Sequence, residues 1–106
     1  VADNASCGVF VLGNARADPR DHDLPSLHVT VTKNGLPLSE GYGSAVQGDP
    51  AQAVAWLANT LGAYGVTLDA GDIILSGSVV PLAPAEKGDV FEMTLHGIGT
   101  CTARFI

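Results

Sequence analysis

The chain has 106 residues, of which 46% are hydrophobic, so it can bury the core of one modest domain. Eleven acidic against five basic residues give a formal net charge of −6, which argues against binding to nucleic acid or an anionic membrane, because both need a basic patch. No apolar stretch approaches the roughly 20 residues that cross a bilayer, and the opening lacks the pattern of a signal peptide. We therefore expect a soluble, cytoplasmic domain that binds a small neutral or cationic molecule, or another protein.

The first half of the chain is predicted to contain strands separated by a loop. Residues 8–13 form a short apolar run between glycines, which predicts a buried strand. A polar, proline-containing loop is expected over residues 14–26. Apolar and polar residues then alternate over 27–32, which predicts a strand with one apolar and one polar face. Asn34-Gly35 predicts a tight hairpin turn into a strand that runs toward Tyr42, and Pro37 indicates that this strand is an edge strand.

One segment has the period of a helix. Asp49 suits the N-cap and Pro50 suits the first helical position. Apolar residues then recur at spacings of three and four, at Val54, Leu57, Ala58 and Leu61. The pattern predicts a helix from Pro50 that ends near Tyr64, at Gly62 or Gly65.

The second half of the chain is again predicted to form short strands. Residues 72–76 are expected to be a buried strand, and Gly77-Ser78 a turn whose amides could face a ligand. Alternation over 91–95 and 101–105 predicts two further strands, joined by a glycine-rich turn at 96–99. The sum is a single domain over residues 1–106 of the α+β class with one principal helix.

Four segments carry a resemblance to a known enzyme family. They read V-A-D-N-A-S-C-G-V-F-V-L-G at 1–13, V-A-W-L-A-N-T-L at 54–61, G-D-I-I-L-S-G-S at 71–78 and G-I-G at 97–99. The chain resembles the C-terminal portion of 2-oxopent-4-enoate hydratases, in the hydratase/decarboxylase branch of the fumarylacetoacetate hydrolase superfamily. The resemblance implies the mixed β-roll of that superfamily's C-terminal domain, here with one principal helix. Because the chain begins at Val1 and its only methionine is Met93, we expect it to be the later part of a longer polypeptide.

The resemblance also implies an activity. Such enzymes hydrate 2-hydroxypenta-2,4-dienoate to 4-hydroxy-2-oxopentanoate in the meta-cleavage degradation of aromatic compounds, with Mg²⁺ or Mn²⁺ as cofactor. A divalent cation can stabilise the charge that develops on the 2-oxo or enolate oxygen. The family forms homo-oligomers and pairs with a sister decarboxylase, which are the partners that the resemblance implies.

The family's metal ligands are glutamates upstream of the V-A-D-N-A-S segment, so we expect no metal ligand in this chain. Its three glutamates, Glu40, Glu86 and Glu92, do not form the family's E-x-E motif. Lys33 and Lys87 are not candidates for the family's upstream catalytic lysine, and Lys33 is interpreted as a solvated hairpin residue. The fragment alone is therefore expected to be inactive.

The resemblance leaves four candidate substrate-binding residues: Asp3, Asn4, Ser6 and Ser78. Ser6 would bond the oxo-acid end of the substrate, and Ser78 would lie beside its carboxylate. Alternatively, Asp3 and Asn4 cap a turn, Ser6 satisfies the backbone, and Ser78 ends a strand.

Other polar or aromatic residues are interpreted as structural. Asp21-His22-Asp23 is expected to be a solvated loop, because consecutive residues seldom converge on one metal ion. His28 is placed on the polar face of its strand and His96 in an exposed turn. Trp56 is assigned to the core or to a subunit interface. Isolated Cys7 and Cys101 do not predict a disulfide.

Three functions therefore remain open. The first is part of a 2-oxopent-4-enoate hydratase, and the second is part of the sister 4-oxalocrotonate decarboxylase. The third is a non-catalytic assembly domain of the same family. If upstream strands are missing, exposed sheet edges and apolar area predict that the chain associates or is poorly soluble.

Overall fold

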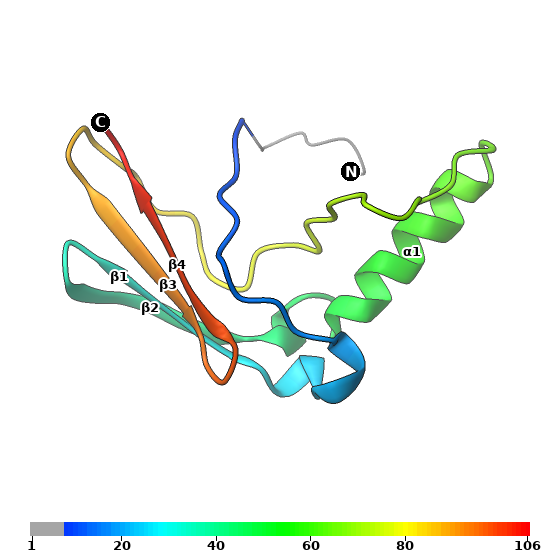
Figure 1. Ribbon diagram of the computed structural model, residues 1–106, viewed down its shortest axis with the longest axis horizontal. Helices are drawn as coiled ribbons and strands as arrows, with labels where there is room; N and C mark the ends of the chain where they lie inside the picture. Colours follow the sequence, from blue (N-terminus) through cyan, green and yellow to red (C-terminus); the bar gives the residue numbers. More distant parts are fainter. Residues whose placement is uncertain (1–7) are drawn as a thin grey trace.

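A computed structural model describes residues 8–106, which form one four-stranded sheet and one long helix (Figure 1). The strands are β1 (His28–Lys33), β2 (Leu36–Tyr42), β3 (Val90–Leu95) and β4 (Gly99–Arg104). The helix is α1 (Pro50–Gly62), and the short 3-10 helices are η1 (Pro19–Asp21), η2 (Leu24–Ser26) and η3 (Gly43–Ala45). The α+β class with one principal helix is confirmed.

The sheet has the order β2-β1-β3-β4, and every neighbouring pair is antiparallel. Asn34 and Gly35 take φ angles of 53° and 81°, so the predicted hairpin turn is confirmed, with positive φ at both central residues. Pro37 lies in the edge strand β2, as predicted, where its missing N–H costs no central ladder bond. The register shifts between Val31 and Thr32, opposite this part of β2.

Helix α1 begins as predicted. The Asp49 side chain accepts a hydrogen bond from the Ala51 N–H at 2.9 Å, and Pro50 occupies the first turn. The helix ends at Gly62, the first of the two predicted glycines, and the N–H of Val66 bonds back to the Leu61 carbonyl at 3.0 Å. Ala53 is buried, and the predicted apolar stripe beside it is half-buried.

Two predicted strands are wrong. Residues 8–13 and 72–76 belong to no strand, and neither run is a buried one, because Phe10 is 51% and Leu75 55% exposed. The first run passes beside β4, where the Cys101 thiol donates to the Val11 carbonyl at 3.6 Å, but it does not join the sheet. An apolar run becomes a strand only where another strand pairs with its backbone.

The sheet and α1 form two arms that meet at the short 3-10 helices (Figure 1). Two extended segments run between the arms, one from the N-terminal side and one from the end of α1 toward β3. Among the described hydrophobic residues, only Val46 and Ala53 are buried. No helix within residues 8–106 is long and apolar enough to cross a membrane.

Candidate functional site

Ser78 is the one candidate substrate-binding residue that the structure describes. It follows Gly77, whose φ of 136° is a conformation that L side chains rarely adopt. A Cβ atom on Gly77 would lie 3.2 Å from the Cγ1 atom of buried Val46. The close approach holds this part of the chain against the residue that follows η3.

A second close approach, between Val79 and Gly41, positions the residue that follows Ser78. The Val79 carbonyl oxygen lies so near Gly41 that a Cβ atom there would collide with it. Gly41 belongs to β2, so the sheet and η3 together position residues 77–79. Ser78 itself is exposed and has no hydrogen-bond partner within the described part of the chain. Its hydroxyl can therefore bond a ligand without giving up a contact inside the protein.

The other three candidates, Asp3, Asn4 and Ser6, lie outside the described residues.

A polar cluster lies at one end of the sheet, around His28. The His28 ring stacks on Tyr42 and on His96, with centroids 4.8 and 4.7 Å apart. Its Nε2 atom lies 2.9 Å from a Glu40 carboxylate oxygen, and His96 Nε2 lies 3.1 Å from the Thr30 hydroxyl. The cluster confirms that His28 is on the polar face and that His96 is exposed. The alternation of β1 signalled the position of His28, whereas its neighbours follow from the strand register.

A second polar cluster lies at the opposite end of β1. Asn34 donates to Asp89 Oδ1 at 3.0 Å, and its own Oδ1 accepts from the Val90 N–H at 2.9 Å. The Glu86 N–H donates to Asp89 Oδ2 at 2.8 Å. The hydrogen bond from Asn34, then that from the Glu86 N–H, and finally the charge of Lys33 lower the pKa of Asp89 below its usual value.

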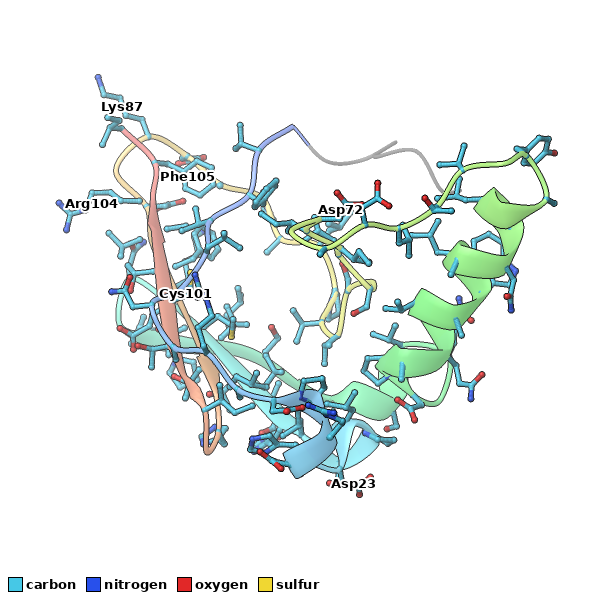
Figure 2. The ribbon with its side chains drawn as sticks, turned by 45° about the vertical axis from the view of Figure 1, so that its right-hand side comes forward. Asp23, Asp72, Lys87, Cys101, Arg104 and Phe105 are labelled. Carbon is cyan, nitrogen blue, oxygen red and sulfur yellow. The ribbon has the colours of Figure 1, made fainter. Side chains whose placement is uncertain are left out.

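Lys33 lies beside the hairpin turn, as interpreted, but its side chain is only partly solvated. Its ammonium lies 3.4 Å from Asp89 Oδ2 and donates to the Pro84 carbonyl at 3.3 Å. It also lies 5.7 Å from the ring centroid of Phe91, and only 31% of the side chain is exposed. Lys33 therefore ties the segment before β3 to β1. Lys87, by contrast, points away from the sheet (Figure 2).

The described residues do not provide a metal centre. No group of three or more His, Cys, Asp or Glu side chains within residues 8–106 could hold an ion. In the loop around Asp21-His22-Asp23, the Asp18 side chain caps η1. Asp18 also pairs with Arg20 at 2.8 Å, and the side-chain hydrogen bond from Arg20 lowers the pKa of Asp18. Asp72, between the two arms in Figure 2, accepts the backbone N–H of Asp69 at 2.8 Å. The donor set therefore does not fit a resident Mg²⁺ or Mn²⁺ ion within this part of the chain.

The sequence matches the fumarylacetoacetate (FAA) hydrolase C-terminal family over residues 1–106. The chain belongs to this family, which confirms the resemblance seen in the four sequence segments.

Among known proteins, the chain is 58% identical over 105 residues to a 2-hydroxyhexa-2,4-dienoate hydratase of Comamonas testosteroni. It is 44% identical to a 2-keto-4-pentenoate hydratase of Paraburkholderia xenovorans. Each match covers 99% of this chain but only 40% and 39% of the relative, so the chain spans about 40% of the length of these curated relatives.

Solved structures also resemble this chain. The 4-oxalocrotonate decarboxylase of Pseudomonas putida G7, in complex with calcium and acetate, superimposes with a TM-score of 0.80 at 38% identity. The match covers 85% of this chain and 35% of the decarboxylase. A second structure of that enzyme contains magnesium and adipate and matches with the same TM-score. These structures support the use of a divalent metal in the family.

Proposed function

We propose that this chain is the C-terminal part of a metal-dependent hydro-lyase that hydrates 2-hydroxypenta-2,4-dienoate to 4-hydroxy-2-oxopentanoate. The observation that carries the proposal is the match to a 2-hydroxyhexa-2,4-dienoate hydratase, which covers 99% of this chain at 58% identity. The reaction belongs to the meta-cleavage degradation of aromatic compounds, and we assign it to the cytoplasm. The enzyme is proposed to act as a homo-oligomer.

Within this proposal, the chain supplies a wall of the substrate pocket. Ser78 would donate its hydroxyl hydrogen to the substrate carboxylate, since it is exposed and held in place by Gly77 and Val79. Asp3, Asn4 and Ser6 are proposed as further substrate contacts on the strength of the sequence resemblance. When bound, a Mg²⁺ or Mn²⁺ ion would stabilise the developing enolate charge. Its ligands are proposed to lie in a part of the enzyme that this chain does not contain.

The second candidate is the sister decarboxylase activity on 4-oxalocrotonate, which the structural match to the P. putida enzyme favours. The names of the Comamonas and Paraburkholderia relatives favour the hydratase. A non-catalytic assembly role remains the third candidate.

The test is an assay of a chimera that joins the unmatched part of the Comamonas hydratase to this chain. We expect Mg²⁺-dependent or Mn²⁺-dependent loss of 2-hydroxypenta-2,4-dienoate absorbance, abolished by EDTA, with 4-hydroxy-2-oxopentanoate as the product. The 2-hydroxyhexa-2,4-dienoate substrate is assayed in parallel to compare side-chain preference. Release of CO₂ from 4-oxalocrotonate without hydration would establish the decarboxylase instead. A folded chimera without either activity would favour the assembly role.

A further inference from the structure

The chain exposes more surface than a compact protein of its size. Its accessible area is 7703 Å², whereas a folded monomer of 10.8 kDa exposes about 5,500 Å². Its radius of gyration is 14.8 Å, against about 13 Å for a compact domain of this length. The surplus is on the order of 2,000 Å².

The exposed apolar side chains are concentrated between those arms. We call residues 8–17 and 66–82 the central segments, because both run between the sheet and α1 (Figure 1). More than half of the exposed large hydrophobic residues in the described chain belong to them. They are Val9, Phe10, Val11, Leu12, Val66, Ile73, Leu75 and Leu82. Such a concentration marks a surface that another part of a protein covers.

The open arrangement is shared with a folded enzyme. The decarboxylase structure reproduces 85% of this chain with a TM-score of 0.80, although the match takes up only 35% of that enzyme. The separated arms are therefore compatible with a complete protein, which has further polypeptide to place around them. The surplus area also exceeds the roughly 800 Å² that each partner buries in an interface of standard size. A large, permanently bound occupant fits this area better than a transient partner.

We propose that the central segments are a docking surface for the part of an FAA hydrolase-type hydratase that this chain lacks, and that this part stays bound without a covalent connection. The choice of occupant rests on the proposed function, but the contact does not depend on which reaction the enzyme catalyses. Ile73 and Leu75 both belong to this surface, with exposed fractions of 54% and 55%.

The experiment uses the same full-length chimera, with a protease site at the junction that is cut after folding. We expect the two pieces to stay together in size-exclusion chromatography with light scattering, as a complex that contains both. The double substitution Ile73→Ser and Leu75→Ser should weaken the complex tenfold or more, since two apolar side chains lose their cover. The control is Leu36→Ser at the hairpin turn, where Leu36 is 70% exposed but lies outside the central segments; it should leave the complex intact.

Several outcomes would overturn the proposal. The pieces would separate after cleavage, or they would stay together regardless of the double substitution. A stable homodimer of this chain alone that the double substitution converts to monomers would make a second copy the occupant. Circular dichroism of the substituted 106-residue chain checks that its own fold is retained, which the exposure of both side chains predicts. Pieces that stay together without hydratase activity would refute only the proposed function.

Discussion

The side-chain amide of Asn34 donates to Asp89 across 55 residues of sequence, and the same side chain accepts from the backbone of Val90. One residue therefore forms the hairpin turn with its positive φ and anchors the start of β3 with its side chain. Lys33 adds its ion pair to the same carboxylate. The turn between β1 and β2 thus also fixes the neighbouring β1–β3 pair.

The two roles of Asn34 can be separated by substitution. Asn34→Gly keeps the positive φ but removes two side-chain hydrogen bonds, which should cost about 1–2 kcal/mol of unfolding free energy. Asn34→Ala also removes them and adds about 1 kcal/mol of left-handed backbone strain. Urea unfolding of the three proteins measures both differences. Equal stability of the glycine variant and the unsubstituted chain would show that the side-chain bonds contribute nothing.

The lowered pKa of Asp89 predicts a contribution to acid sensitivity. The unfolded chain protonates this carboxyl near its ordinary pKa of about 4, whereas the folded chain does so only at lower pH. Its stabilising contribution is therefore complete above about pH 4 and is lost as the pH falls through the folded pKa. Asp89→Asn should be less stable at pH 7 and lose less stability on acidification. Parallel urea titrations at pH 7 and pH 3 test this, and identical losses in both proteins would contradict it.

The N-cap of α1 offers a local test. Asp49→Ala removes the hydrogen bond to Ala51 and should cost about 1 kcal/mol of stability. Asp49→Asn is the matched control, because an asparagine side chain caps a helix about as well. Thermal unfolding followed by circular dichroism compares the three proteins. If the asparagine variant loses as much as the alanine variant, charge and not hydrogen bonding stabilises this helix end.

The elements with local signals were predictable from the sequence, and those that depend on distant partners were not. The start of the helix is predicted by Asp49-Pro50, and the hairpin turn by Asn34-Gly35. Both predictions are right because these residues determine the conformation of their own backbone. Residues 8–13 and 72–76 have strand-like composition, but pairing depends on the rest of the fold. The contacts of Lys33 could not be predicted for the same reason, since Pro84, whose carbonyl accepts its hydrogen bond, is 51 residues away.

The candidate site shows the same division. Ser78 was chosen through the family resemblance, but the sequence could not show that Gly41 and Val46 hold the residues on either side of it. The high glycine content of the sequence indicates turns. It does not reveal that a side chain at position 41 would collide with the Val79 carbonyl, which is why glycine fits there. Close backbone approaches are properties of the folded chain.

The proposed role of Ser78 predicts a binding defect. In the chimera, Ser78→Ala should raise KM for the dienoate roughly 10- to 100-fold, because a hydrogen bond to a charged carboxylate is worth about 1.5–3 kcal/mol. Ser78→Thr keeps the hydroxyl and should restore much of the affinity. Steady-state kinetics of both variants test the role. An unchanged KM for the alanine variant would leave Ser78 as a residue that only connects segments.

Gly41 should act on the same site without touching the substrate. A Cβ atom in Gly41→Ala would collide with the Val79 carbonyl and displace the backbone next to Ser78, so KM should rise several-fold, with a smaller effect on kcat. The control is Gly62→Ala at the end of α1, where a Cβ atom meets nothing within 4 Å. This control should keep the KM of the chimera and gain about 0.5–1 kcal/mol of stability from better helix propensity. Combining Gly41→Ala with Ser78→Ala completes the test: if Gly41 acts only by positioning Ser78, its substitution should add little to the KM of the Ser78→Ala enzyme. Full additivity of the two effects would mean that Gly41 influences binding by a different route.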